Sequence, residues 1–143
     1  MINPQGTDRR FLHHPGANDL FTEIDIIDEH LKDAYLFHFG YPPLMEKMYA
    51  DDGNRLKYLF NKVKGSGLIT SLDMAFPDPA SAAGRADWVS ILRNVLPYVD
   101  IFVPSIEEIL FMLRKSESVG LATNLLEMVS EELLAMGTKV VLL

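Results

Sequence analysis

The feature that most constrains the fold is an alternation between short apolar runs and apolar residues at helical spacing. The runs, which read as strands, are residues 34–39, 68–72, 100–103 and 139–143. The stripes, in which apolar residues recur three or four positions apart, are residues 56–63, 88–96, 106–113 and 125–136. Strands that alternate with helices in this way predict right-handed βαβ units and a parallel sheet.

The predicted strands are apolar on both faces, which is typical of a sheet with helices on both sides. The expected fold class is therefore α/β, with three layers (αβα) around a Rossmann-like, mostly parallel sheet. The chain of 143 residues is long enough for a core, and 48% of its residues are hydrophobic. It has no cysteine, which excludes a disulfide scaffold and fits a reducing, cytoplasmic location.

The charge balance and the hydropathy pattern argue against two classes of partner. The formal net charge is −7, which is unfavourable for a surface that binds nucleic acid. No apolar run approaches the ~20 residues of a membrane span, and no signal-peptide pattern is visible at the N-terminus. We therefore expect neither a nucleic-acid partner nor a membrane partner.

The two ends of the chain look like interior parts of a larger domain. Residues 4–8 predict a hairpin turn with 9–13 as the returning strand, but its partner strand would need residues before Met1. A helix is predicted next from the spacing of Leu20, Ile24, Ile27 and Leu31. Residues 140–143 read as a buried strand with no loop after it. We therefore expect an incomplete domain that forms homo-oligomers through exposed apolar surfaces.

Two candidate ligand residues follow predicted strands. Gly40 ends the first run and Asp73 follows the second, so both belong to the edge where parallel sheets bind ligands. The Asp73 carboxylate suits a phospho-acceptor, a metal ligand or a polar contact to a substrate, and a loop cap explains it at least as well.

Ser105 and Glu108 follow the third run. Their spacing predicts a capping box, in which each side chain bonds the backbone N–H of the other. Glu108 also suits a cation bound to phosphate, because hard cations prefer carboxylate oxygens. The two interpretations are compatible.

Gly16, Ala17 and Asn18 form a small-residue turn near the N-terminus. Such a turn lets a ligand approach the backbone, and the Asn18 amide can both donate and accept hydrogen bonds. The alternative is an ordinary turn in which Asn18 or Asp19 caps the next helix.

Taken in order, these segments resemble the middle of a ribokinase-like (PfkB-type) carbohydrate kinase. The resemblance rests on Arg9, Arg10 and Phe11 with residues 15–18, on residues 36–43, on Leu72, Asp73, Met74 and Pro77, on residues 100–109, and on 139–143. The stretch 100–109 is the most specific, since it resembles the family's strand followed by Pro-Asn-x-x-Glu. In this sequence Ser105 stands where the family usually has Asn.

The resemblance implies transfer of the ATP γ-phosphoryl group to a hydroxyl of a sugar or nucleoside, with Mg²⁺. The implied substrate-binding residues are Gly16, Asn18 and Gly40. The implied phosphate and metal environment comprises Asp73, Ser105 and Glu108. Residues 1–19 would be the remnant of a lid hairpin with its Gly-Ala-Asn turn, and residues 20–143 the central βαβ units.

Two segments of the family pattern are absent from the sequence. These are the N-terminal Gly-Gly segment and the Gly-Ala-Gly-Asp segment, so no catalytic residue is assigned and the base is expected beyond Leu143. Because phosphoryl transfer depends on positioning and charge stabilisation, we expect no kinase activity from this chain alone. The alternative hypothesis is a non-catalytic α/β ligand-binding or interaction module, in which Asp73 is a regulatory or ligand contact.

Overall fold

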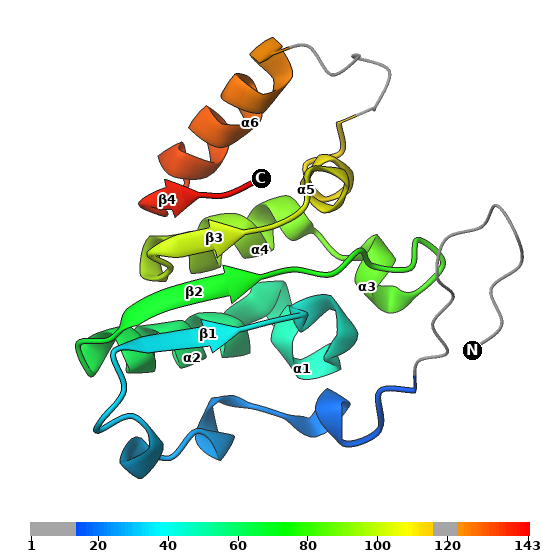
Figure 1. Cartoon of the computed structure of the whole chain (residues 1–143). Coiled ribbons are helices and arrows are strands. Elements are labelled where there is room, and N and C mark those ends of the chain that lie inside the picture. The colour runs from blue at the N-terminus through cyan, green and yellow to red at the C-terminus, as the bar shows by residue number, and fades with distance from the viewer. Residues whose placement is uncertain (1–13, 116–122) are drawn as a thin grey trace, which may run out of the picture.

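A computed structural model describes residues 14–115 and 123–143. Its centre is a four-stranded sheet in the order β1-β2-β3-β4, and every neighbouring pair is parallel (Figure 1). The strands are β1 (Leu36–Phe39), β2 (Ile69–Asp73), β3 (Ile101–Val103) and β4 (Val140–Val141). The predicted parallel α/β sheet is therefore confirmed.

Six α-helices are present in the described residues. They are α1 (Glu46–Tyr49), α2 (Asn54–Gly65), α3 (Ala82–Arg85), α4 (Trp88–Val95), α5 (Ile106–Met112) and α6 (Thr123–Ala135). The apolar stripes predicted α2, α4, α5 and α6, and the residues of each stripe are mostly buried. None of the helices in this part of the chain is long and apolar enough to span a membrane.

One face of the sheet packs against α2 and α4, which lie behind it in Figure 1. Phe37 and Phe39 of β1 both meet the ring of Phe60 in α2 edge to face, with ring centroids 6.0 and 6.4 Å apart. Leu72 and Phe102, which are paired across β2 and β3, are fully buried. The core fills the space between this face and the two helices and extends to buried residues of α5 and α6.

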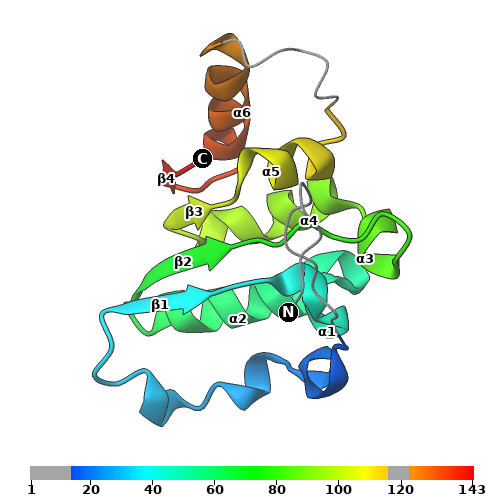
Figure 2. The ribbon, with the colours of Figure 1, turned by 45° about the vertical axis from the view of Figure 1, so that its right-hand side comes forward.

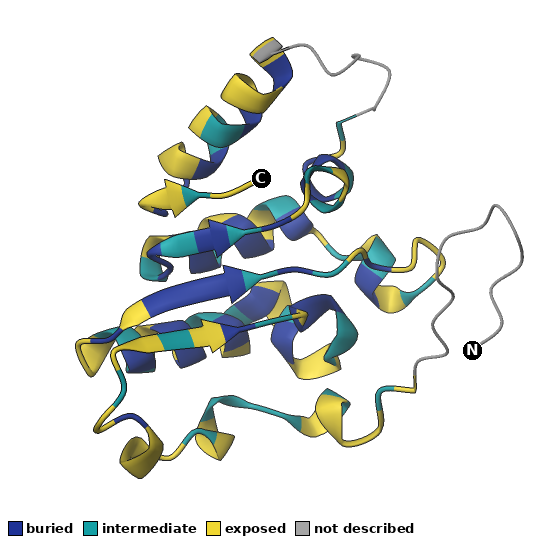
Figure 3. Cartoon of the chain, in the orientation of Figure 1, coloured by how far each residue is buried: buried dark blue, intermediate teal, exposed yellow. Residues whose placement is uncertain are grey.

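The opposite face of β1 and β2 is not covered by a helix in the described part of the chain. Leu36 is 47% exposed and Ile69 is 49% exposed, although both begin strands of the sheet. Figure 3 shows exposed positions along β1 and β4. We call this surface the open face. The expectation of helices on both sides is met on one side by the described residues.

The prediction of a helix through Leu20, Ile24, Ile27 and Leu31 is wrong. The segment instead forms three short 3₁₀ turns, η1 (Gly16–Leu20), η2 (Glu23–Asp25) and η3 (Asp28–His30). Leu20 and Ile24 are more than 70% exposed.

Tertiary contacts explain why this segment is not helical. Phe21 stacks on Phe39 with ring centroids 5.7 Å apart, and the carbonyl of Ile26 accepts a hydrogen bond from Lys62. Thr22 and Asp25 bond each other in a capping box that closes a single turn. Phe21 and Ile26, which are five positions apart, therefore both pack against the core. In a single α-helix, residues on the same face are three or four positions apart.

Of the two ends of the chain, the structure tests only the C-terminal prediction. The hairpin of residues 4–13 lies outside the described residues. The last strand is shorter than the predicted 139–143, and it is not buried, since Val140 is 44% and Leu142 53% exposed. No described strand pairs with the outer edge of β4, which leaves these residues accessible.

The loops that follow β1, β2 and β3 meet at one end of the sheet. They lead to α1, α3 and α5, which lie on the side to which the strands point (Figures 1 and 2). This carboxyl edge is the usual ligand-binding edge of an open parallel sheet.

Candidate functional site

Gly40 and Asp73 lie next to each other at the carboxyl edge. The N–H of Tyr41 donates to the Asp73 carbonyl at 3.2 Å, which extends the pairing of β1 with β2 beyond Phe39. A Cβ placed on Gly40 would lie 4.0 Å from Oδ2 of Asp73. Two residues that are 33 positions apart in sequence thus border the same small space.

The Asp73 side chain is half-buried, and only part of it is used locally. Its Oδ1 accepts the N–H of Met74 at 2.8 Å, as the loop-cap interpretation predicts. In the part of the chain that the structure describes, no hydrogen bond reaches Oδ2.

His38 and Ser71 complete the group around Gly40. The sequence analysis did not name either residue as part of a site. The Nδ1 atom of His38 lies 3.1 Å from Oγ of Ser71, because the two residues are paired across β1 and β2. One sequence signal could have indicated them. His38 is two residues before Gly40, and Ser71 is two residues before Asp73, so each pair shares a face of its strand.

Ser105 and Glu108 form the predicted capping box. The Ser105 N–H donates to Oε2 of Glu108 at 2.8 Å, and Oγ of Ser105 accepts the N–H of Glu108 at 3.4 Å. They begin α5 two residues after Val103, which is paired with Asp73. The loop after β3 therefore starts beside the loop after β2 at the carboxyl edge.

Gly16 and Asn18 lie on η1 and are exposed. This turn packs against α1, and Oδ1 of Asp19 accepts the N–H of Glu46 at 2.9 Å at the start of α1. Within the described residues, no hydrogen bond joins Gly16 or Asn18 to Gly40 or Asp73.

A cavity of about 500 Å³ connects the N-terminal turn to the loops after β1 and β2. Its lining residues include Pro15, Asp19, Pro43, Phe76 and Asp78. Burial, followed by the nearby carboxylates of Glu46 and Asp19, raises the pKa of Tyr49, which also lines it. The cavity places η1 near the carboxyl edge but lies apart from the group around Gly40.

The donor set for a metal ion is incomplete. No group of three or more His, Asp or Glu side chains capable of holding a metal occurs in residues 14–115 and 123–143. Asp73 and Glu108 are single carboxylates, each already engaged with a backbone N–H. These residues do not form a magnesium site by themselves.

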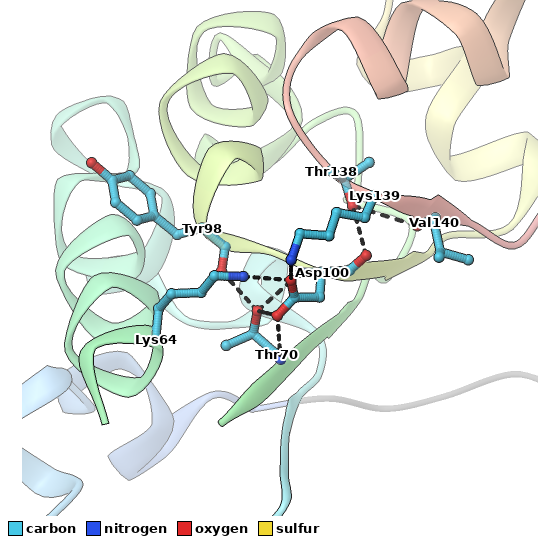
Figure 4. Close-up of polar contacts among 7 residues, drawn as sticks. All are labelled: Lys64, Thr70, Tyr98, Asp100, Thr138, Lys139 and Val140. Atoms are coloured by element: carbon cyan, nitrogen blue, oxygen red, sulfur yellow. Dashed lines mark hydrogen bonds and ion pairs between the residues drawn. The ribbon is translucent and has the colours of Figure 1, made fainter. Parts of the chain in front are cut away.

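A second polar cluster occupies the opposite, amino edge of the sheet (Figure 4). The side chain of Asp100 is 12% exposed, and its carboxylate forms ion pairs with Lys64 and with Lys139, the latter at 2.7 Å. Its Oδ2 accepts the N–H of Thr70 at 3.1 Å. The Thr70 hydroxyl in turn donates to the Tyr98 carbonyl at 2.7 Å and accepts the Asp100 N–H at 2.9 Å.

The protonation of Asp100 reflects this cluster. Burial raises the pKa of Asp100, but the hydrogen bonds from Lys139, Lys64 and Thr70 outweigh burial and hold the pKa well below its usual range. A cavity of about 440 Å³ adjoins the cluster. Because the charges are already paired with one another, we assign the cluster to stability rather than to ligand binding.

Comparisons with known proteins yield structural likeness only. No family model matches the chain, and no curated protein matches it. A PfkB protein from Polaromonas sp. JS666 matches at 18% identity with a TM-score of 0.58, over 85% of this chain and 38% of that one.

Two structures of fructokinase from Xylella fastidiosa match in the same way. One matches at 19% identity and a TM-score of 0.59, over 90% of this chain and 38% of that one. The other, with bound ATP, matches at 18% identity and a TM-score of 0.58, over 87% and 36%. The fold is therefore ribokinase-like α/β, as predicted, and the chain spans well under half the length of these structures.

Proposed function

We propose that this chain forms the central part of the α/β domain of an ATP-dependent carbohydrate kinase, acting on a sugar or nucleoside hydroxyl. The observation that carries the proposal is the carboxyl edge, where Gly40 borders Asp73 and α5 begins beside them. This edge belongs to a fold that the chain shares with a fructokinase that has bound ATP.

In this proposal the residues at the ends of β1 and β2 bind the substrate, and the residues at the start of α5 position the adjacent loop. Gly40 leaves room for the substrate, and Asp73 offers a carboxylate oxygen that no described residue occupies. Ser105 and Glu108 hold the start of α5 through their capping box, and thereby set the loop that would border the phosphate region. Gly16 and Asn18 would approach the substrate from the N-terminal turn.

The reacting groups would come from outside this chain. Phosphoryl transfer needs a base and a cradle for the phosphates, and neither is visible in the sequence. ATP and Mg²⁺ therefore belong to the proposal for a longer protein. We expect this chain alone to release no ADP in the presence of sugars.

The test begins with the coding sequence beyond Leu143. A Gly-rich loop followed by Gly-Ala-Gly-Asp is expected in the same reading frame. The longest product is then assayed for ADP release with ATP, Mg²⁺ and a panel containing fructose, ribose and adenosine. Absence of those segments, or a full-length product that phosphorylates nothing in a broad panel, would contradict the kinase proposal.

A further inference from the structure

The open face carries one group of polar side chains. His38 lies opposite Ser71, and two residues further along both strands Gly40 lies opposite Asp73. Because residues two apart on a strand share a face, all four positions belong to the face away from α2. Phe37 and Phe39, which alternate with them on β1, point to α2 instead.

The surroundings of this group are apolar. Leu36 and Ile69 lie one step back along β1 and β2 on the same face, and both are about half exposed. Ile101 and Val103 of β3 are paired with Ser71 and Asp73 and are only partly buried. A mostly apolar surface on which a few polar groups converge is typical of sites for small molecules.

Within residues 14–115 and 123–143, the imidazole of His38 forms a hydrogen bond through one ring nitrogen, and none reaches the other. Nδ1 is engaged by the hydroxyl of Ser71, a residue that is only 5% exposed and therefore a fixed support. Nε2 lies 3.8 Å from the point that a Cβ on Gly40 would occupy. Oδ2 of Asp73 lies 4.0 Å from the same point. A ring nitrogen and a carboxylate oxygen thus converge on one small space.

The space exists because residue 40 has no side chain, and the fold does not require glycine there. At Gly53 and Gly84 an added Cβ would meet Ile91 Cγ2 at 2.7 Å and the Asp78 carbonyl oxygen at 2.2 Å, so packing explains those glycines. At Gly40 the nearest atoms are at ordinary contact distance, and φ is not in the left-handed region. Neither packing nor backbone conformation accounts for Gly40.

We propose that this space binds two adjacent hydroxyl groups of a neutral polyol, one on Oδ2 of Asp73 and one on Nε2 of His38. A carboxylate only accepts hydrogen bonds, so it requires a donor and repels anions. A hydroxyl group donates and accepts, and therefore pairs with Nε2 in either tautomer of the ring. The inference deepens the proposed function, on which it rests for the polyol being a sugar.

Binding is tested on this chain by NMR titration with three probes. They are D-ribose, which has adjacent hydroxyls, 1,3-propanediol, whose hydroxyls are not adjacent, and inorganic phosphate. The reporters are the backbone N–H groups of Tyr41 and Met74, which bond to the carbonyl and to Oδ1 of Asp73. Saturable shifts of both signals are expected with ribose alone. Equal shifts with phosphate or with 1,3-propanediol would overturn the proposal.

Two substitutions and a matched control locate the site. Gly40→Ala fills the space at ordinary contact distance, so it should fold normally yet bind ribose at least about tenfold more weakly. Asp73→Asn keeps the shape and the bond to Met74 but loses the charge, and should weaken binding to a similar extent. Gly65→Ala, where a Cβ meets nothing within 4 Å, should bind like the unaltered chain.

The results separate this inference from the kinase proposal. If Gly40→Ala binds ribose as well as Gly65→Ala does, the site is not at Gly40 and the inference fails, whatever the longer protein phosphorylates. If ribose binding depends on Gly40 and Asp73 while the longest product transfers no phosphoryl group, the site stands and the kinase proposal fails. Unchanged kcat/KM in Gly40→Ala of an active longer protein would also overturn the inference.

Discussion

The two edges of the sheet hold their polar groups in opposite ways. At the amino edge, every oxygen of the Asp100 carboxylate is bonded, and two lysines surround it. At the carboxyl edge, His38 and Asp73 each use one polar atom locally and direct the other toward the same space. A fully bonded cluster stabilises a fold, whereas a partly bonded one is suited to a ligand.

Neighbouring hydroxyls in β2 show the contrast within a single dipeptide. The Thr70 hydroxyl faces the amino-edge cluster and has bonds to Tyr98 and Asp100, while the Ser71 hydroxyl faces the open side and, among the described residues, hydrogen-bonds only with His38. Both residues are buried. Burial by itself therefore does not distinguish a structural polar group from one that supports a site.

The largest effect is expected from Asp100→Asn. The substitution removes the charge that Lys64 and Lys139 share and should lower the free energy of unfolding by about 2 kcal/mol, because both lysines stay partly exposed to water. Urea denaturation measures it. The control is Asp52→Asn at an exposed position, which should change the free energy by about 0.5 kcal/mol or less. Equal effects of the two substitutions would show that the cluster is not structural.

The same cluster predicts the response to acid. Since the folded pKa of Asp100 is lowered, its ionised form stabilises the folded state at pH values above the unfolded pKa of about 3.9. That stability is lost as the pH falls below this value toward the folded pKa. In urea denaturation between pH 6 and strongly acid pH, the difference between the unaltered chain and Asp100→Asn should be constant at first and then shrink. A difference that grows on acidification would contradict the assignment.

A smaller effect is expected from Thr70→Val than from Asp100→Asn, but a larger one than from Ser71→Ala. Removing the Thr70 hydroxyl leaves the Tyr98 carbonyl and the Asp100 N–H without that partner, which should cost about 1.5 kcal/mol. Ser71→Ala should cost about 0.5 kcal/mol, because the exposed His38 ring can bond water instead. Thermal and urea unfolding of both variants test the order, and the reverse order would undo the comparison of the two edges.

The smallest effect on stability concerns the open face. We expect concentrated solutions of the chain to contain homo-oligomers formed through its exposed apolar residues. Leu36→Lys, at the edge strand, should lower the mass seen by light scattering while changing stability by about 0.5 kcal/mol or less. Tyr58→Lys, an exposed aromatic on α2, is the control and should leave the mass unchanged. A monomer at all concentrations would refute the expected association.

Local periodicity explains which parts of the fold were predictable. The stripes of α2 and α4 bury their apolar residues as the spacing requires, and the capping box of Ser105 and Glu108 is a local pattern. The segment through Ile24 and Ile27 has similar spacing but is not helical. Its conformation depends on Phe39, which is distant in sequence and against which Phe21 packs. A pattern of one segment carries no information about such a contact.

For the same reason, only two of the four residues of the candidate site could be named from the sequence. Gly40 and Asp73 could be named because each follows a strand, whereas the contact of His38 with Ser71 depends on which residues of β1 and β2 are paired. The roles assigned to Gly40 and Asp73, like those of Gly16, Asn18, Ser105 and Glu108, stay predictions. The places of the last four at η1 and at the start of α5 are known, but no contact ties them to Gly40.

The sequence by itself determined the alternation of strands and helices, and hence a parallel sheet with a ligand-facing edge. Only the tertiary structure decided the register, which sets His38 opposite Ser71 and Gly40 opposite Asp73. The physical reason is that side chains alternate between the two faces of a strand, so a shift of β1 by one residue would turn His38 and Gly40 toward α2 and away from Ser71 and Asp73. The packing of Phe37 and Phe39 on Phe60 opposes that shift, and thereby places the polar group on the open face.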